Sequence, residues 1–597
     1  MLWLRPLTHG FRRPFRHLRR HWRAVAIGLA LVPVHAAAVL CMPSLLGGAL
    51  DQISAGGTAD ALATTCWILL GLAAVEAGAR FTARKLLIDA SREVERSLKD
   101  ELARHLQRVP IAWFDRSRTG DITARMTQDV ELVRFVMGPL LLHGGSTLFL
   151  LPAGAWLMVT MNVPVALTSL GVLSSVLLAM RALLPRLHGW SKRSQEAIAA
   201  ISQRAQEDFA GVRVIQQFAI TDRQRAAMAT RNRRFLLANL RLVRLRSLMN
   251  ALTHSSSGLV MLSVLTVGGH QVITGHLTVG QLFQFTGYLG LMTFPLQILG
   301  WTIAMIPRAL AGAQRIEELF AVAPEPRDGA QPELRGAIEV RGLTFTYPGS
   351  DRPALRDVSF SLPAGGRLGL VGPVGSGKST LIGLLLRFYD PPRGTVFVDG
   401  RDVLDLAPDV LRRLFALAPQ EPFLFSDTIG NNVAFHAADL LERDASKGAR
   451  DLAIAAAALD QDLPRLPGGL DTVVGERGVT LSGGQKQRVS LARALLSDRP
   501  ALLLDDTLSA VDANTERRIL DGLGQARRAR TMITVSHRLS VVRDADLILI
   551  LRAGHVVERG DHHTLLRSNG AYALAWRRQH EAQALAGEEP DDHGEAR

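Results

Sequence analysis

A glycine-rich run in the second half of the chain carries the residue types that bind phosphate. It reads Gly372-Pro373-Val374-Gly375-Ser376-Gly377-Lys378-Ser379-Thr380 and fits the pattern G-x-x-x-x-G-K-[ST]. Glycines let consecutive backbone amides turn toward a phosphate without Cβ clashes, and Lys378 adds a full positive charge. Ser379 has a hydroxyl that can ligate Mg²⁺. The run predicts a nucleotide site, the alternative being a glycine-rich turn with an incidental lysine.

The segments on either side can hold this loop as phosphate binding requires. Residues 368–371 are apolar with strand character, and residues 381–388 have a helical apolar pattern. A helix that begins at the loop directs its N-terminal partial positive charge at the same phosphate. We therefore expect a strand, a phosphate loop and a helix in that order.

Two further segments have matching chemistry. Residues 501–505 predict an apolar strand that ends in Asp505, a carboxylate that can hold Mg²⁺ through water. The segment Leu481-Ser482-Gly483-Gly484-Gln485 opens an amphipathic helix, with Ser482 as its cap and glycine amides at its positive end. Two anion sites in one small domain are explained if two such domains dimerise across a shared nucleotide.

Length and composition indicate a multi-domain membrane protein. The 597 residues are too many for one core, and 47% of them are hydrophobic. The only two cysteines, Cys41 and Cys66, lie in apolar runs, which argues against a disulfide framework or a cysteine metal site and predicts buried packing residues. The net charge of +14 is compatible with nucleic-acid binding, but the basic residues flank apolar segments. The expected partner is therefore a lipid membrane and not a nucleic acid.

The first half contains four long stretches without Asp, Glu, Lys or Arg, which cover residues 24–50, 61–75, 135–180 and 247–307. A spanning helix needs about 20 apolar residues, so the first two stretches suit one helix each and the last two suit hairpins. The six predicted spans cover about residues 24–48, 61–81, 136–160, 164–184, 250–273 and 281–306.

The basic residues set the predicted orientation. Residues 1–23 carry seven arginines and no acid, residues 80–134 carry twelve Lys or Arg, and residues 181–246 carry fourteen. By the positive-inside rule these segments and both termini are cytoplasmic. Within residues 1–23, the segment from Phe11 to Arg23 is predicted to be a basic amphipathic helix on the inner membrane surface.

Both long cytoplasmic loops are helical in pattern, and each has one interruption with turn chemistry. These interruptions lie near residues 111–121 and 217–224. Short helices there could contact another domain, and the alternative is a solvated turn. Glu76 is the one carboxylate inside a predicted span, where it could face a polar substrate cavity or reach water near the cytoplasmic end.

The linker and the second domain follow the transmembrane domain of residues 24–322. Residues 323–335 carry three prolines and no apolar periodicity, so they predict a linker. From 336 to 579, short β-type runs alternate with turns and helices, which indicates an α/β domain. The acidic tail, residues 580–597, is predicted to be disordered toward its end.

The ordered motifs of the second half resemble the nucleotide-binding domain of the ATP-binding cassette (ABC) family. Six spans fused ahead of such a domain resemble the half-transporters of its exporter class. The resemblance covers about residues 10–580. It implies a six-helix transmembrane domain followed by an α/β P-loop ATPase domain, in the cytoplasmic (inner) membrane, with ATP and Mg²⁺ as ligands and a second half-transporter as partner.

The resemblance also implies roles for single residues. Tyr347 matches the aromatic residue that stacks on adenine, and Gln420 matches the glutamine that touches Mg²⁺ and senses the membrane domain. His537 matches the switch histidine, and Asp512 lies in the loop that links two nucleotide sites. The residues that match the signature reaching the γ-phosphate on the opposite subunit are Leu481, Ser482, Gly483, Gly484 and Gln485.

Three other segments resemble regions of exporters that connect the two domains. The segment Gly475-Glu476-Arg477-Gly478 resembles a loop positioned to meet the membrane helices, and the other two segments are Asp115 to Asp121 and Thr221 to Arg223. The last two lie in the loop interruptions described above, and the resemblance identifies them as coupling regions.

Asp506 departs from the family pattern. Active members place a glutamate after the residue that matches Asp505, as the general base for the attacking water. Aspartate is one methylene shorter, so its carboxylate sits roughly 1.5 Å back, and misplacement on that scale can cost about 100-fold in rate. The alternative is that a backbone shift lets aspartate work.

The departure resembles a known class of heterodimeric exporters with one degenerate nucleotide site. The run from Asp505 to Asp512 looks like the multidrug-resistance-like half-transporters of bacteria. The resemblance implies ATP-driven export or flipping of an amphipathic or lipophilic substrate. Two alternatives stay open: a homodimeric lipid flippase or multidrug exporter with Asp506 as a working base, and a membrane-bound regulatory subunit that binds ATP.

Overall fold

The structure is a computed structural model that describes residues 10–326, 328–436, 444–475, 481–509, 511–525 and 530–585. Contacts divide the chain into two compact units. One comprises the residues before 108 together with 119–322, and the other comprises 108–118 together with the residues from 323 onward. The segment 108–118 therefore belongs to the second unit, although it lies far from that unit in the sequence.

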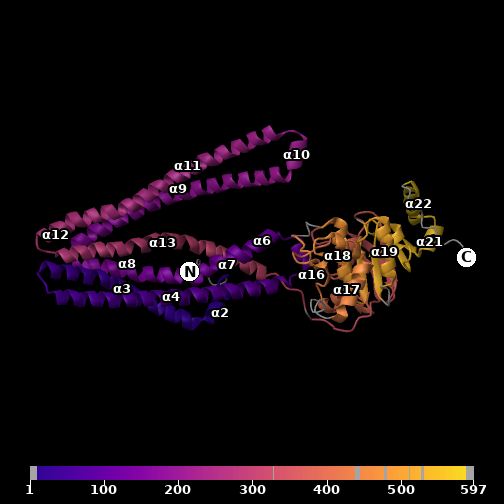
Figure 1. The fold of residues 1–597 in the computed structure, drawn as a ribbon, viewed down its shortest axis with the longest axis horizontal. Coiled ribbons are helices and arrows are strands. Elements are labelled where there is room, and N and C mark those ends of the chain that lie inside the picture. Colours follow the sequence, from indigo (N-terminus) through magenta and orange to yellow (C-terminus); the bar gives the residue numbers. More distant parts are fainter. Residues whose placement is uncertain are drawn as a thin grey trace. The chain divides into compact units, whose positions relative to one another are not determined.

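The first unit is entirely helical (Figure 1). Its helices are α2 (Arg12–Arg19), α3 (Trp22–Ser54), α4 (Ala59–Leu106), α6 (Thr119–Ala124), the π-helix η1 (Arg125–Asp129), α7 (Val130–Met137), α8 (Pro139–Met161), α9 (Val163–Ala210), α10 (Val212–Gln217), α11 (Thr221–Ser263), the π-helix η2 (Val264–Gly268), α12 (Gly269–Ile273) and α13 (Val279–Phe320).

Five helical stretches among the described residues are long and apolar enough to cross a membrane. They are Trp22–Ser54, Ala59–Leu106, Thr119–Met161, Val163–Ala210 and Thr221–Ile273. The sixth predicted span, residues 281–306, lies within α13. Four of the predicted spans lie in single helices, whereas the third crosses the α7–α8 junction and the fifth crosses the π-helix η2.

Polar caps begin the helices that follow the two predicted hairpin turns. Asn162 accepts a hydrogen bond from the backbone nitrogen of Val165 at the start of α9. Thr278 and Gln281 form a reciprocal capping box at the start of α13. These caps satisfy backbone amides that a helix leaves without partners, which explains why the chain turns there.

The expectation that both cysteines are buried is wrong. Cys41 in α3 and Cys66 in α4 are exposed on the chain. Both lie on helices long and apolar enough to cross a membrane, and such helices present apolar side chains outward to lipid, so an apolar sequence context does not imply burial within the protein.

The N-terminal helix is held on the first unit by one face. Phe11, His17 and Leu18 are buried. His17 Nε2 lies 2.8 Å from Glu101 Oε2 of α4, and the Arg13 guanidinium donates to Glu101 and to Glu317 of α13. The remaining arginines of α2 are exposed, as the predicted basic amphipathic helix requires.

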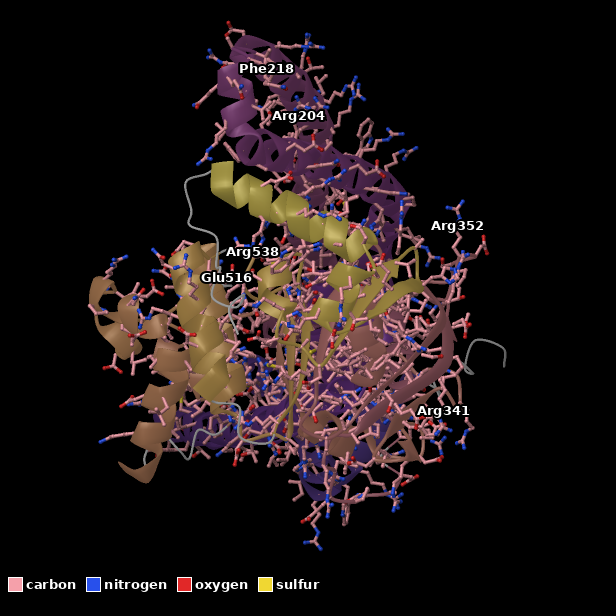
Figure 2. The ribbon with its side chains drawn as sticks, turned by 90° about the vertical axis from the view of Figure 1, so that its right-hand side faces the viewer. Arg204, Phe218, Arg341, Arg352, Glu516 and Arg538 are labelled. Atoms are coloured by element: carbon pink, nitrogen blue, oxygen red, sulfur yellow. The ribbon has the colours of Figure 1, made fainter. Side chains whose placement is uncertain are left out.

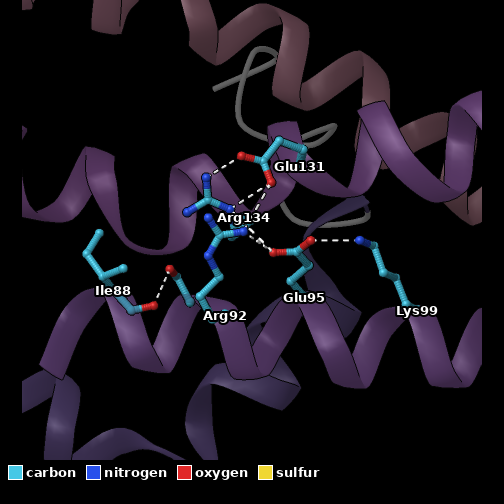
Figure 3. A network of polar contacts seen from close by, with 7 residues as sticks. Ile88, Arg92, Glu95, Lys99, Glu131 and Arg134 are labelled. Atoms are coloured by element: carbon cyan, nitrogen blue, oxygen red, sulfur yellow. Dashed lines mark hydrogen bonds and ion pairs between the residues drawn. The ribbon is translucent and has the colours of Figure 1, made fainter. Parts of the chain in front are cut away.

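Charged side chains join α4 to α7 beyond the predicted spans (Figure 3). Glu95 of α4 accepts hydrogen bonds from Arg92 at 2.8 Å and from Lys99 at 2.7 Å. Arg134 of α7 lies 3.5 Å from Glu95 and pairs with Glu131 on its own helix. Each charge has an opposite partner, so the network ties the helices together without leaving an isolated ion.

The helices α9 and α11 continue past the predicted spans and pack along each other, with α10 connecting their far ends (Figure 1). Several apolar side chains near α10 are exposed. They are Phe209, Val212, Val214 and Phe218, with Phe218 66% exposed.

The second unit is an α/β domain with two sheets. Its strands are β1 (Ile338–Phe345), β2 (Leu355–Leu362), β3 (Arg367–Val371), β4 (Val396–Val398), β5 (Arg401–Asp402), β6 (Phe415–Ala418), β7 (Ala501–Asp505), β8 (Thr531–Val535), β9 (Leu547–Arg552) and β10 (His555–Gly560). The sheet orders are β2-β1-β4-β5, which is antiparallel, and β10-β9-β3-β8-β7-β6, in which only β10 is antiparallel.

The second unit also contains helices, most of which connect its strands. They are α5 (Ile111–Phe114), α14 (Lys378–Leu385), α15 (Pro408–Leu414), α16 (Ile429–Val433), α17 (Asp444–Ala456), α18 (Gly483–Leu496), α19 (Ala513–Gln525), α20 (Leu539–Val542), α21 (His562–Arg567) and α22 (Ala571–Leu585), with short 3₁₀ turns at Leu459–Gln461, Leu463–Arg465 and Gly469–Asp471. One apolar cluster joins both sheets to α14, and another joins β6 and β7 to α17, α18 and α19.

Gly138 lies where the start of α8 meets α4. A Cβ at this position would be 2.5 Å from Ser91 Oγ and 3.0 Å from the Leu87 carbonyl oxygen. No side chain fits there without moving a helix. We therefore expect Gly138→Ala to destabilise the first unit by roughly 1–3 kcal/mol, the usual cost of overpacking.

The measurement is the thermal midpoint of the detergent-purified chain. The matched control is Gly144→Ala on the same helix, where the nearest atom to a new Cβ is 3.6 Å away. Equal midpoints for the two variants would contradict the predicted close contact.

Candidate nucleotide site

The phosphate loop has the geometry that its sequence predicts. It connects β3 to α14, and Gly372, Gly375 and Gly377 have φ angles of +159°, +79° and +106°. A Cβ on Gly377 would lie 2.7 Å from the Ala354 carbonyl oxygen. At this position the left-handed backbone and the close approach both require glycine.

Lys378 is buried at the first turn of α14. Its ammonium donates to the carbonyl oxygens of Gly372 at 2.7 Å and Pro373 at 2.9 Å. Burial lowers the pKa of Lys378, and the charges of Asp506 and Asp505 partly offset that effect. The loop therefore holds a cation beside the backbone amides that would receive a phosphate.

Asp505 ends the buried strand β7 and lies close to the phosphate loop. Burial raises the pKa of its carboxyl group, a hydrogen bond from Ser379 opposes the rise, and the charge of Asp506 adds to it. A hydroxyl and a carboxylate in contact are oxygen ligands of the kind that hold Mg²⁺ together with substrate phosphates. Ser379 and Asp505 thus fit Mg²⁺ bound with a nucleotide.

Parallel pairing brings the other predicted residues to the same edge of the sheet. Gln420 follows β6 and His537 follows β8, while the phosphate loop follows β3. The carboxyl ends of these strands, together with that of β7, form the edge where open α/β sheets bind ligands. The side chains of Gln420 and His537 are exposed.

Asp506 follows β7 in a constrained backbone. Its φ is +47°, its amide donates to the Val535 carbonyl at 2.9 Å, and its own carbonyl accepts from Ser509 Oγ at 2.9 Å. Residues with positive φ are mostly glycine, and aspartate tolerates this region better than most others. The 8% exposed side chain is therefore attached to a backbone that is held on both sides.

Tyr347 lies in an aromatic cluster next to the phosphate loop. Its hydroxyl donates to Thr380 Oγ1 at 3.1 Å, and its ring meets the ring of Tyr389 edge to face at 5.0 Å. Sequence reasoning missed Tyr389. Its position shortly after the helix of the phosphate loop is the only signal that could have found it.

The segment 108–118 is bound to this aromatic cluster. Asp115 Oδ2 accepts the Tyr389 hydroxyl at 2.5 Å, and Arg116 donates to the Pro348 carbonyl at 2.8 Å. Burial and the contact with Asp115 raise the pKa of Tyr389 to about 12, so the phenol stays protonated as the donor. The first predicted coupling region thus contacts the loop that carries Tyr347.

The signature segment begins α18 with an open N-terminus. Ser482 and Gln485 form a reciprocal capping box, and Ser482 and Gly483 are exposed. The Arg488 guanidinium binds Asp462 at 2.6 and 2.9 Å and fixes the helix on its subdomain. Leu481 is buried.

Asp512 caps α19, where it accepts hydrogen bonds from the Thr515 amide and hydroxyl. These bonds lower the pKa of the Asp512 carboxyl group. Gln487 of α18 donates to Ser509 at 3.4 Å, which links the signature helix to the segment before Asp512. Of the predicted segment 475–478, residues 476–478 lie outside the described residues.

Glu76 is buried between α3 and α4. Its carboxylate lies 3.1 Å from His35 Nδ1 and 3.3 Å from Arg80 Nε. The charge is paired within the helix bundle, which accounts for a carboxylate inside a predicted span.

These features define the class of protein as a membrane-spanning protein with an attached ATPase domain. The phosphate loop of that domain and the carboxylates of Asp505 and Asp506 lie at one edge of its sheet. Two protein-family models match this chain, one in each half of it. The family description "ABC transporter transmembrane region" matches residues 25–296, and "ABC transporter" matches residues 355–509.

Two relatives match nearly the full length. The multidrug resistance-like ATP-binding protein MdlA of Escherichia coli is 36% identical over 592 residues, covering 97% of this chain and 98% of the relative. The ATP-dependent lipid A-core flippase of Vibrio vulnificus is 32% identical over 582 residues, covering 95% and 97%. A solved bacterial Atm1-family ABC exporter with ATP bound has a TM-score of 0.73 at 29% identity, covering 93% and 98%.

The chain belongs to the ABC transporter family and is an exporter half-transporter. It is a multi-pass protein of the inner membrane, with a cytoplasmic nucleotide-binding domain that binds ATP and couples its hydrolysis to transport.

The geometry of Gly377 leads to a direct test of the phosphate loop. Because its φ is +106° and a Cβ would meet the Ala354 carbonyl, Gly377→Ala should weaken MgATP binding by at least about tenfold. The measurement is equilibrium binding of a fluorescent ATP analogue to the purified chain. Gly383→Ala in α14, where a Cβ meets nothing within 4 Å, should bind the analogue like the wild type.

Proposed function

We propose that this chain is one half of a heterodimeric ABC exporter and that its own nucleotide site turns ATP over slowly. Its partner is a second half-transporter whose phosphate loop lies against the signature segment of this chain. The complex exports or flips an amphipathic or lipophilic substrate. The observation that carries the proposal is Asp506 in the position of the general base.

The backbone at Asp506 supports a slow site. A shorter side chain reaches the attacking water only if the backbone moves forward, and here the backbone is hydrogen-bonded to Val535 and Ser509. Its left-handed φ also suits aspartate. Asp506 therefore leaves a carboxylate that is set back by about one methylene from the position of a glutamate carboxylate.

The signature segment supports a competent partner site. Ser482 and Gly483 are exposed at a capped helix end, and the helix is fixed by the pair Arg488 and Asp462. Such an end presents backbone amides to a phosphate. The chain thus has an intact signature segment, which would complete the nucleotide site on the phosphate loop of its partner.

The exposed tip near α10 supports a second subunit. Phe209 is 77% exposed and Phe218 is 66% exposed, both at the far end of the α9–α11 pair (Figures 1 and 2). Large apolar side chains gathered at an exposed tip mark a protein contact. This tip includes the second predicted coupling region, and we assign it to the nucleotide domain of the partner.

The lining of an apolar cavity of about 130 Å³ in the first unit is of the kind that contacts lipophilic molecules. The cavity lies among α9, α11, η2 and α13, and its lining includes Leu173, Val264 and Leu289, with Thr286 and Thr293 as polar groups. Apolar walls with a few hydroxyls suit an amphipathic molecule. The names of the two relatives, a multidrug resistance-like protein and a lipid A-core flippase, are consistent with this class.

Transport would proceed by alternating access. ATP binding closes the two nucleotide domains, the coupling regions transmit the closure to the helices of the dimer, and the cavity opens outward. Lys378 and the loop amides hold the phosphates, and Ser379, Asp505 and Gln420 would hold Mg²⁺, which neutralises phosphate charge. Hydrolysis at the partner's site and phosphate release reset the transporter.

The base position can be tested with one substitution. Asp506→Glu should raise ATP turnover at this chain's own site by about tenfold or more, measured in the purified complex with the partner's nucleotide site inactivated, because the carboxylate then reaches the attacking water. The matched control is Asp498→Glu, the same change at a fully exposed aspartate. Protein that co-purifies from the native membrane identifies the partner.

Two results would overturn the heterodimer. If the chain alone hydrolyses ATP rapidly and Asp506→Glu adds nothing, it is a homodimeric exporter or flippase in which Asp506 is a working base. If transport is lost on deletion of the chain but kept with Lys378→Ala, it is a regulatory subunit.

Removing the contact between Asp115 and Tyr389 tests whether it couples ATP hydrolysis to transport. Tyr389→Phe keeps the ring against Tyr347 but removes the hydroxyl that binds Asp115. We expect ATP hydrolysis within twofold of the wild type and transport lowered roughly three- to tenfold, because an exposed hydrogen bond contributes about 0.5–1.5 kcal/mol.

Transport is measured as uptake of an amphipathic fluorescent dye into inside-out vesicles. Tyr572→Phe, which removes a phenol bonded to His562, is the control outside the coupling contact. A parallel loss of hydrolysis and transport in Tyr389→Phe would show that the contact only stabilises the domain.

A further inference from the structure

The loop that carries His537 is held by the C-terminal helix. The Gln579 side-chain amide of α22 donates from Nε2 to the His537 carbonyl at 2.7 Å and accepts from the Leu539 amide at Oε1 at 3.0 Å. One side chain thus binds the backbone on both sides of Arg538. The glutamine amide offers a donor and an acceptor at the end of one side chain, so it can make both bonds at once.

The helix that carries Gln579 is itself anchored. Glu558 accepts hydrogen bonds from the amides of Ala571 at 2.5 Å and Tyr572 at 3.1 Å at the start of α22. Tyr572 is 1% exposed and packs in a cluster that contains Val371, which precedes the phosphate loop, and Leu539, which follows His537. The position of Gln579 is therefore set by the same core that supports β3 and β9.

A second set of contacts, from α19 and the segment before it, also holds the loop. The Arg538 guanidinium pairs with the buried Glu516 of α19 and donates to the Val511 carbonyl at 3.2 Å, and Ser540 Oγ donates to Glu516 at 2.7 Å (Figure 2). Arg538 and its neighbours are thus fixed to the segment that contains Asp512. His537, by contrast, has an exposed side chain.

We infer that Gln579 is a positioning residue for His537. The hydrogen bond to its carbonyl orients the backbone of His537, which follows β8 at the nucleotide edge of the sheet. The clamp between Arg538 and Glu516 holds the next residue but makes no bond to the His537 backbone, so it cannot replace Gln579. The inference rests on the proposed function, in which His537 has the switch role that the family resemblance implies.

The test compares Gln579→Met, which keeps the length of the side chain but removes both hydrogen bonds, with Arg578→Met at the exposed neighbouring position. Both are made in the full chain, purified with its associated subunit in lipid nanodiscs. Turnover is measured in whichever of the wild-type and Asp506→Glu chains is faster and, in a heterodimer, with the partner's nucleotide site inactivated, so that hydrolysis at the partner's site does not mask the effect.

In Gln579→Met, we expect hydrogen–deuterium exchange of residues 536–540 to rise roughly fivefold, because the Leu539 amide loses its acceptor. We expect kcat to fall roughly tenfold with the KM for ATP within twofold of the parent value, because a loop that is out of place by about 1 Å affects the reaction more than nucleotide binding. Arg578→Met should change neither quantity.

A double-mutant cycle with His537→Ala separates positioning from general stability. If Gln579 acts through His537, the double variant is no slower than His537→Ala alone, because the group to be positioned is gone. Unchanged exchange, or losses of kcat that multiply in the double variant, would overturn the inference.

Failure of the proposed function has a different signature. If His537→Ala leaves kcat unchanged while exchange in Gln579→Met still rises, the switch role of His537 is wrong and the inference falls with it. If His537→Ala lowers kcat and Gln579→Met does not, only the inference is wrong.

Discussion

Parallel pairing of β3, β8, β7 and β6 places the ends of four strands at one edge, and the nucleotide site depends on this constraint. The phosphate loop, Asp505, Gln420 and His537 are separated by many residues in the sequence but follow neighbouring strands. Strand β7 is buried along its whole length, so the carboxylate at its end is fixed by apolar packing on both faces. The residues of the nucleotide site are therefore brought together by the sheet, and they need few direct contacts among their own side chains.

The helical unit obeys a different constraint, because in lipid a helix must satisfy its own backbone and keep isolated charges away from hydrocarbon. Its ion pairs follow this rule. Glu76 is paired with His35 and Arg80 inside the bundle, and the network of Glu95 and Arg134 lies beyond the predicted spans. The long helices can thus pass from lipid to cytoplasm without a break.

The sequence predicted those features that depend only on residues close together in the chain. Spacing alone identified the loop from Gly372 to Thr380, and charge-free stretches located the membrane helices. The burial of Cys41 was predicted wrongly, because hydropathy does not distinguish a side chain that faces lipid from one that faces protein. The contacts of Tyr389 with Asp115 and of Gln579 with His537 could not be predicted, since each joins residues whose proximity depends on the tertiary fold.

The place of residues 108–118 in the second unit has a consequence for how the protein is made. The contacts from Arg116 to Pro348 and from Asp115 to Tyr389 span 232 and 274 positions of the chain. Contacts of such long range form late, and on the ribosome this segment emerges well before the domain that receives it. The second compact unit is therefore discontinuous in the gene. A fragment that begins at the linker would lack one of its own surface elements and would expose the aromatic cluster that this element covers.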